Sequence, residues 1–297
     1  MTQVYLNGHF INQQDAMVSV MDRGFMFADG AYEVIPAFYR VPFRVEQHLA
    51  RLDFSLSSIR IENPLKHEEW LRVFAKLLAQ NSSEHQSIYL QVTRGVAPDR
   101  NHLWPKGLEP TVFVMTSPLQ MKLDEDFSHV QGMTAITTED LRWKRCDIKA
   151  IALLPNVLHR QRAEEAGADE AILINEQGQV TEGSSSNVFI VKGNEIATPP
   201  KDMPILGGIT RDLIIELLQS DAKSNYTLSE RMVSQDELHE ADEVWITSST
   251  KEICPITLLD NQPVGKGKIG AVWYDIAGRY QRYKLQLATE HRENLPT

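Results

Sequence analysis

The sequence has few of the features that mark disulfide scaffolds and membrane proteins. Its 2 cysteines among 297 residues are too few for a disulfide framework and fit a reducing compartment. Cys146 could act as a nucleophile, but a small buried thiol is the commoner explanation. No apolar run approaches the roughly 20 residues that a membrane span requires. Residues 1–10 hold no basic stretch followed by an apolar one, so we expect no signal peptide, no membrane partner and a cytoplasmic location.

The charge balance excludes a further group of partners. The formal net charge is −10 and the pI is about 5.4, and there is no basic block and no interleaving of basic and aromatic residues. Nucleic acids bind proteins through clustered Lys and Arg, so no nucleic acid is expected as a partner. Repeats and low-complexity segments are also absent. With 42% hydrophobic residues, the chain is long enough for one large or two medium globular domains.

Strand and helix patterns come in groups along the chain and do not alternate strictly. Residues 4–11 predict a hairpin with Asn-Gly at its turn, and residues 30–38 predict a strand that is interrupted near Pro36. Apolar residues at helical spacing predict helices over 46–59, 67–80, 155–166, 210–218 and 276–287. Strands are predicted over 88–93, 111–116, 133–137, 170–174, 186–191 and 243–247. This grouping favours an α+β fold over a doubly wound sheet.

A polar, charged stretch divides the chain. Residues 119–131 are rich in polar and charged side chains and are the best candidate for a linker between domains. We therefore predict a small N-terminal domain over 1–120, a linker over 121–131 and a larger domain over 132–297.

Two short segments suggest the chemistry. Lys149 ends the segment Arg-Cys-Asp-Ile-Lys and precedes the apolar residues 150–154, which would desolvate its amine. Glu182 follows 33 residues later within Thr-Glu-Gly-Ser-Ser-Ser-Asn, residues 181–187. Enzymes that use pyridoxal phosphate (PLP) need such a pair: the lysine forms an imine with the cofactor aldehyde, and the acid holds a proton on the pyridine nitrogen. Taken singly, a solvated lysine and a turn glutamate would be the ordinary explanations.

Three further groups could bind a phosphate. Residues 207–210, Gly-Gly-Ile-Thr, precede a predicted helix with Thr210 as its N-cap, and a helix N-terminus presents free N–H groups to an anion. Residues 247–250 place four hydroxyls at the end of a predicted strand, and Arg51 lies in a helix with an apolar stripe. Without a ligand, these are a capped helix, a strand–loop junction and a surface arginine.

Together these segments resemble the fold-type IV PLP-dependent aminotransferases. The matching segments, in order and spacing, are residues 22–24, 29–33, 145–149, 181–187, 208–211 and 248–252. The resemblance covers nearly the whole chain. It implies an α+β architecture with a small N-terminal α/β domain, a larger C-terminal pseudo-barrel domain, bound PLP and a homodimer.

The resemblance gives each candidate residue a role. Lys149 matches the Schiff-base lysine, and Glu182 matches the partner of the pyridine nitrogen. The residues matched to the phosphate contacts and to the apolar residue on the ring face are Arg51, Ile209, Thr210, Ser249 and Leu206. Many relatives have threonine at the position of Ser249, and serine keeps the hydroxyl.

The loop before residue 105 distinguishes members of the family. Arg100-Asn101-His102 resembles the Arg-x-His carboxylate trap of D-amino acid aminotransferases, in which both side chains reach across the dimer interface. In those enzymes a tyrosine matched by Tyr32 completes the site for the substrate α-carboxylate, and we assign Thr250 to the substrate as well. An arginine fork suits a carboxylate because it donates two parallel hydrogen bonds. Asp99 looks like an extra residue that adds an acid next to this site.

The resemblance therefore implies a D-amino acid:2-oxo acid aminotransferase. Its substrates would be D-alanine, D-glutamate or D-aspartate with pyruvate or 2-oxoglutarate, in a ping-pong cycle. Fixing the carboxylate decides which face of Cα presents its hydrogen to Lys149. A branched-chain L-aminotransferase is the nearest alternative, and an aminodeoxychorismate lyase ranks third. A PLP-binding protein without turnover is the alternative from another class.

Overall fold

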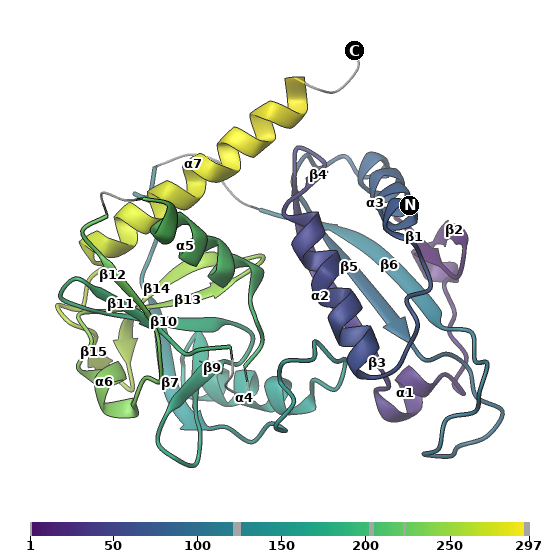
Figure 1. Ribbon diagram of the computed structural model, residues 1–297, viewed down its shortest axis with the longest axis horizontal. Helices are drawn as coiled ribbons and strands as arrows, with labels where there is room; N and C mark the ends of the chain where they lie inside the picture. Colours follow the sequence, from purple (N-terminus) through teal and green to yellow (C-terminus); the bar gives the residue numbers. More distant parts are fainter. Residues whose placement is uncertain (1, 121–125, 202–204, 222–223, 294–297) are drawn as a thin grey trace. The chain divides into compact units, whose positions relative to one another are not determined.

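The computed structural model describes residues 2–120, 126–201, 205–221 and 224–293 (Figure 1). Contacts divide the chain into two compact units. The first unit comprises Met1–Lys122 and Ile148–Leu153, and the second comprises Leu123–Asp147 and Leu154–Thr297. The predicted linker lies partly outside the described residues, so the division at 1–120, 121–131 and 132–297 remains a prediction.

The first unit is built on an antiparallel sheet with the strand order β2-β1-β6-β5-β3-β4. Its strands are β1 (Gln3–Leu6), β2 (His9–Asn12), β3 (Gly30–Phe38), β4 (Val41–Pro42), β5 (Gln86–Thr93) and β6 (Thr111–Pro118). The predicted hairpin is confirmed, because β1 and β2 pair across Asn7 and Gly8. Both turn residues have positive φ, 47° and 91°, as a two-residue hairpin turn requires.

The predicted interruption of the strand near Pro36 is wrong, because β3 is continuous. The carbonyl of Pro36 accepts a hydrogen bond of 2.7 Å from the backbone N–H of Phe43, the residue after β4. This carbonyl therefore points to the side of β3 on which β4 lies, opposite to β5. The nitrogen and oxygen of one strand residue point to the same side. The proline nitrogen therefore faces away from β5, and no hydrogen bond between β3 and β5 is lost.

The two long helices of this unit, α2 (Val45–Ser58) and α3 (His67–Gln80), cover one face of its sheet (Figure 1). The short helices are η1 (Gln13–Asp15) and α1 (Arg23–Phe27). Residues such as Leu52 of α2 and Phe74 of α3 form the core with the inward residues of the strands. The predictions of helices over 46–59 and 67–80 are confirmed.

The second unit contains a mixed sheet with the order β12-β11-β10-β13-β14-β7-β8-β9, and β15 pairs with β14. Its strands are β7 (Met133–Glu139), β8 (Glu170–Ile174), β9 (Val180–Gly183), β10 (Asn187–Lys192), β11 (Glu195–Thr198), β12 (Thr227–Glu230), β13 (Glu243–Ser248), β14 (Glu252–Leu259) and β15 (Gln262–Pro263). β9 ends the sheet, yet only residues 184–186 separate it from β10, near the other end. The sheet must therefore curl, which confirms the expected pseudo-barrel.

The helices of the second unit are α4 (Leu154–Glu165), α5 (Ile209–Ser220), α6 (Gln235–His239) and α7 (Ala271–Glu293). The last helix begins five residues before its predicted start at 276. The carboxylate of Glu243 accepts hydrogen bonds from the backbone N–H groups of Val272 and Trp273, at 2.9 and 2.8 Å, and so caps this helix from a distant strand. Among the described helices, none combines the length and apolarity of a membrane span.

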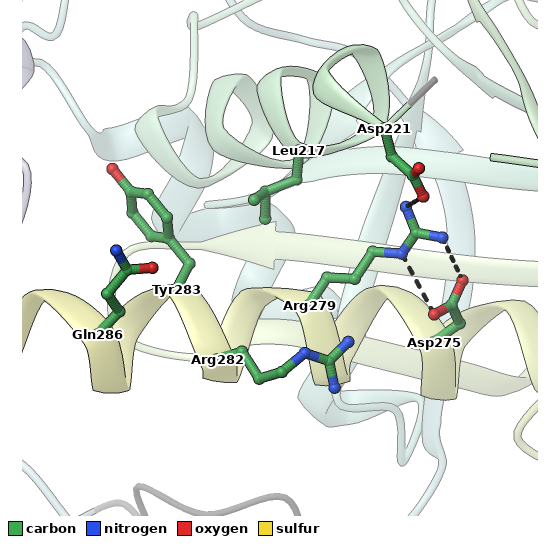
Figure 2. Close-up of a pocket in the computed structure, with 7 residues that line it drawn as sticks. All are labelled: Leu217, Asp221, Asp275, Arg279, Arg282, Tyr283 and Gln286. Atoms are coloured by element: carbon green, nitrogen blue, oxygen red, sulfur yellow. Dashed lines mark hydrogen bonds and ion pairs between the residues drawn. The ribbon is translucent and has the colours of Figure 1, made fainter. Parts of the chain in front are cut away.

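A surface groove lies along α7, and Figure 2 shows its lining. Arg279 pairs with Asp275 one turn earlier, at 2.9 Å, and with Asp221 after the end of α5, at 2.7 Å. Leu217 and Tyr283 contribute to its walls. The lining residues include none of those predicted for the site.

Candidate active site

In the first unit, Lys149 lies on a segment that runs along β3. The backbone N–H of Tyr32 donates to the carbonyl of Lys149 at 3.0 Å, and the N–H of Lys149 donates to the hydroxyl of Ser55 at 3.1 Å. The side chain therefore starts from a fixed backbone. Its Nζ lies 4.1 Å from the centroid of the Tyr32 ring. This ring shields the half-buried lysine, whereas Ala152 in the apolar run that follows is exposed.

A buried carboxylate lies beside Tyr32 on β3. Glu33 accepts hydrogen bonds from Nε and Nη2 of Arg51, at 2.7 and 2.8 Å, and its Oε2 lies 2.8 Å from Nδ1 of His48. Burial raises the pKa of Glu33, but Arg51 and His48 outweigh it and hold that pKa far below its usual range. Arg51 is thus oriented by a strand residue. Its contact with a phosphate stays a prediction.

Glu33 and His48 were not among the site residues predicted from the sequence. The available signal was an acidic residue inside the otherwise apolar strand 31–38, because a carboxylate in such a place needs a buried cationic partner.

Arg100 and His102 lie together in an exposed loop against α1. The guanidinium carbon of Arg100 is 5.1 Å from the centroid of the Phe27 ring, and the centroid of the His102 ring is 5.3 Å from the same centroid. The ring of Tyr32 packs instead against that of Tyr89, with 5.9 Å between centroids. The structure thus groups Arg100 with His102, and Tyr32 with the proposed catalytic lysine.

In the second unit, Glu182 lies within β9 and is buried. One oxygen of its carboxylate accepts a hydrogen bond from Nη1 of Arg142. The other accepts from the backbone N–H of Leu206 at 2.9 Å and from the side-chain amide of Asn187 at 3.3 Å. Burial raises the pKa of Glu182 above its usual range although Arg142 lowers it. A fixed carboxylate with enhanced proton affinity is suited to share a proton with a basic nitrogen.

Arg142 is a third residue of the candidate site that the sequence did not indicate. Its Nε and Nη2 donate to the carboxylate of Asp140 at 2.9 and 2.7 Å, and the hydroxyl of Thr181 donates to the same carboxylate at 2.7 Å. The guanidinium therefore joins the turn after β7 to β9. Arg142 occurs in a polar stretch with other basic residues, so its sequence context gave no sign of burial.

The start of α5 differs from the prediction. Gly208 is the N-cap and Thr210 the second helical residue, so the assignment of Thr210 as N-cap is wrong. The side-chain amide of Asn187 donates to the carbonyl of Leu206 at 2.8 Å and holds the residues before the helix. A Cβ on Gly208 would lie 1.9 Å from Oδ1 of Asn187, so a side chain here would displace the amide that holds Leu206 and Glu182. Ile209 and Thr210 consequently form the first turn of the helix.

Ser249 and Thr250 lie in the turn between β13 and β14. In the preceding strand, the buried hydroxyl of Thr247 has no hydrogen-bond partner among the described residues. Thr247 pairs with Asn187 across the strands, so an unsatisfied polar group lies beside the residue that holds Glu182. Such a group fits a polar ligand.

The turn at Ser249 is anchored from α7. Glu252, which ends it, has a φ of 59°, a strained value for a residue other than glycine. Its carboxylate accepts hydrogen bonds from the fully buried Lys284 and from the side-chain amide of Gln281, the latter at 2.8 Å. These contacts hold the turn in its strained conformation.

Cys146 is buried, and desolvation raises the pKa of its thiol to about 12. The thiol is therefore protonated at neutral pH and is a poor nucleophile. Within the described part of the chain, no group of His, Cys, Asp and Glu residues could hold a metal ion.

The comparisons with known proteins identify the family to which this fold belongs. The family described as amino-transferase class IV matches residues 30–259. The chain belongs to this family, and the expected fold-type IV architecture is confirmed.

Individual relatives are more specific. A D-alanine aminotransferase of Bacillus licheniformis is 42% identical over 268 residues, which cover 90% of this chain and 92% of the relative. One of Staphylococcus epidermidis is 38% identical over 285 residues, covering 95% and 98%. Among solved structures, a branched-chain amino acid aminotransferase of Escherichia coli has a TM-score of 0.85 and 26% identity, covering 93% of this chain and 92% of that chain.

Proposed function

We propose that this chain is a PLP-dependent D-amino acid aminotransferase that converts D-alanine and 2-oxoglutarate into pyruvate and D-glutamate. The observation that carries the D-specific part is the pair Arg100 and His102, presented on an exposed loop and held against Phe27. Such a pair can bind an α-carboxylate through charged hydrogen bonds. The resemblance to D-alanine aminotransferases over most of the chain supports the same substrate class.

The second unit fits a phosphorylated pyridine. The N–H groups of Ile209 and Thr210 lie in the first helical turn, where no intrahelical acceptor exists, and they would bind the phosphate. The hydroxyls of Thr210 and Ser249 would add hydrogen bonds, and the apolar side chain of Leu206 would pack on the ring. The unpartnered hydroxyl of Thr247 and the closely fitted Gly208 agree with a polar ligand here.

Each charged residue then has a defined role. Bound PLP supplies an electron sink for the negative charge that develops at the substrate Cα. Glu182 would hold a proton on the ring nitrogen. The amine of Lys149 would tether the cofactor and move the proton at Cα as base and then acid. Arg51, oriented by Glu33, would add its charge to the phosphate site.

We further propose a cytoplasmic homodimer. Large apolar side chains are more than two-thirds exposed in the segments around α1 and the loop that contacts it: Met17, Val20, Phe25 and Leu103. Exposed apolar groups of this size indicate an interface, and a second copy of the chain is the proposed partner.

A half-reaction screen tests the substrate class. Enzyme loaded with PLP is mixed with D- or L-alanine and D- or L-leucine, and the cofactor absorbance is followed over a single turnover. We expect rapid conversion with D-alanine and slow conversion with both L-amino acids. A preference for L-leucine would favour the branched-chain alternative, and no conversion by any amino acid would favour a binding protein without turnover.

Hybrid dimers test whether Arg100 serves the partner subunit. Lys149→Ala chains should be inactive, and Arg100→Ala chains should use D-alanine poorly at a concentration near the wild-type KM, where the assay is run. The two chains are coexpressed in equal amounts. If Arg100 acts across the interface, hybrids contain one complete site, and random pairing restores about a quarter of the wild-type activity. If Arg100 acts within its own chain, coexpression restores nothing.

A further inference from the structure

The short helix α1 and its N-cap, residues 22–27, contact the loop of Arg100 and His102 through more than the ring of Phe27. Arg23 on this helix is buried, and its guanidinium donates to three acceptors. Nη1 donates to the carbonyl of Asn101 at 2.6 Å, and Nη2 donates to the carbonyl of His102 at 3.1 Å. Nε donates to the carboxylate of Asp29 at 2.8 Å. Two of these bonds thus fix the backbone next to Arg100 and at His102.

The arginine that holds the loop is itself held. Asp29 also accepts two hydrogen bonds from Arg94, at 2.7 and 2.9 Å, and Arg94 donates in turn to the carbonyl groups of Ile59 and Arg60 at 2.7 and 3.0 Å. Burial raises the pKa of Asp29, but the two arginines outweigh it and keep that pKa below its usual range. The pairing of Arg23 with a charged carboxylate therefore persists at neutral pH.

The helix is fixed to the sheet by its N-cap. Asp22 is fully buried and accepts hydrogen bonds from the N–H of Gly24 at 2.7 Å and from the hydroxyls of Thr93 and Thr111 at 3.0 and 2.6 Å. A Cβ on Gly24 would lie 2.3 Å from the methyl group of Thr93, so the helix lies directly against the end of β5. This contact explains the Asp-Arg-Gly motif.

The last residue of the helix touches the side chains of the loop. The ring of Phe27 lies 5.1 Å from the guanidinium carbon of Arg100 and 5.3 Å from the ring of His102. The guanidinium carbon of Arg23 is also 4.8 Å from this ring. Phe27 is thus in contact with both residues of the proposed carboxylate trap and with the arginine that fixes their backbone.

We propose that Arg23 and Phe27 are positioning residues for the substrate α-carboxylate site. Arg23 sets the backbone of the loop, and Phe27 sets the direction of the Arg100 and His102 side chains. Arginine suits this task because its three nitrogens spread the donors over a planar fork, whereas the three donors of lysine leave a single nitrogen. This inference rests on the proposed role of Arg100 and His102.

Kinetics of the loaded enzyme test the inference. Phe27→Leu removes the ring, and Arg23→Lys keeps the charge but loses the fork. We expect the KM for D-alanine to rise about three- to tenfold in Phe27→Leu and about tenfold or more in Arg23→Lys. The kcat and the PLP content should change less than about twofold, since neither residue contacts the cofactor in this scheme.

Two matched controls separate this role from general loosening of the fold. Arg40 also donates to a backbone carbonyl, that of Asn81 at 3.2 Å, and Phe54 is an exposed ring on α2. Arg40→Lys and Phe54→Leu should leave the KM unchanged. Should Arg23→Lys fail to fold, Phe27→Leu alone decides the outcome.

A double-mutant cycle gives the sharpest comparison. In an Arg100→Ala background, Phe27→Leu should raise the KM little further, because the residue through which it acts is gone. Independent, multiplicative losses would overturn the positioning role, as would variants of Arg23 and Phe27 that behave like the controls. If Arg100→Ala itself leaves D-alanine kinetics unchanged, the carboxylate trap fails, and the positioning role fails with it.

Discussion

Two buried glutamates, one in each unit, are paired with arginines, and their pKa values shift in opposite directions. Glu33 accepts two hydrogen bonds from Arg51 and contacts His48, and these partners hold its pKa far below the usual range in spite of its burial. Glu182 contacts Arg142 through one oxygen and two amides through the other, and burial keeps its pKa above the usual range.

The difference separates two uses of the same pair of residue types. A carboxylate that stays charged under all ordinary conditions is suited to orient an arginine, which is the role proposed for Glu33. A carboxylate that retains affinity for a proton is suited to share one with a pyridine nitrogen, which is the role proposed for Glu182. Arg142 itself is shared with Asp140, so Glu182 does not receive the full fork.

The largest effect is expected where the proposed chemistry takes place. Lys149→Ala removes the amine that would tether PLP and move the proton at Cα, so the visible absorbance of the lysine-linked cofactor and essentially all turnover should be lost. Absorbance spectra and a D-alanine assay measure both. Near-wild-type activity in this variant would contradict the assignment of Glu33 and Glu182 to a PLP site.

Glu182→Gln sharpens the comparison from the catalytic side. The amide cannot stabilise a positive pyridinium, and loss of such a preorganised partner costs on the order of 2–4 kcal/mol of barrier. Single-turnover rates with D-alanine should fall accordingly while PLP still binds. An unchanged rate would mean that Glu182 does not partner the ring nitrogen.

Lys284→Met tests whether the contact of Lys284 with Glu252 supports the turn that contains Ser249, a proposed phosphate ligand. Glu252 would lose its buried ammonium partner, and the turn containing Ser249 would loosen, so we expect the PLP dissociation constant to rise about tenfold. Equilibrium dialysis of PLP measures this constant, with the exposed Lys268→Met as control. A lower thermal midpoint with unchanged PLP affinity would restrict Lys284 to the stability of the fold.

The pKa of Glu33 predicts a smaller, pH-dependent effect. A carboxyl whose pKa is lower in the folded chain stabilises the fold above its ordinary pKa of 4.5, and this contribution is lost as the pH falls below that value. Between pH 6 and pH 3 the wild-type protein should therefore lose about 2 kcal/mol more unfolding free energy than Glu33→Gln does. Urea titrations of both proteins measure the difference, and equal losses would contradict a permanently charged Glu33.

Much of the fold follows from the sequence because periodic apolar residues dominate it. The helix over 67–80 was predicted to the residue from the stripe that includes Trp70 and Phe74, and the predicted strands lie within two residues of their observed ends. The early start of α7 could not be predicted, since its N-terminal cap is the carboxylate of Glu243 on a distant strand.

The candidate site was accessible from sequence only where a motif marks it. β9 escaped prediction because Thr181-Glu182-Gly183 lacks alternating apolar residues, and polar partners satisfy it instead. Arg142 and the partners of Glu33 escaped because the contacts come from other elements, which a local pattern cannot show. The acidic residue in an apolar strand indicates only that Glu33 needs a partner. The roles of Lys149, Glu182 and the phosphate ligands themselves stay predictions.

The most direct test of the two carboxylates compares Glu33→Gln with Glu182→Gln in one set of measurements. PLP affinity is measured by dialysis, and the single-turnover rate with D-alanine is measured on the loaded protein. We predict that Glu33→Gln weakens PLP binding about tenfold, because Arg51 loses the group that orients it, and leaves the rate of the loaded protein near that of the wild type. Glu182→Gln should show the reverse. Equal losses of affinity and rate in both variants, or a slower loaded protein in Glu33→Gln, would contradict the division of roles.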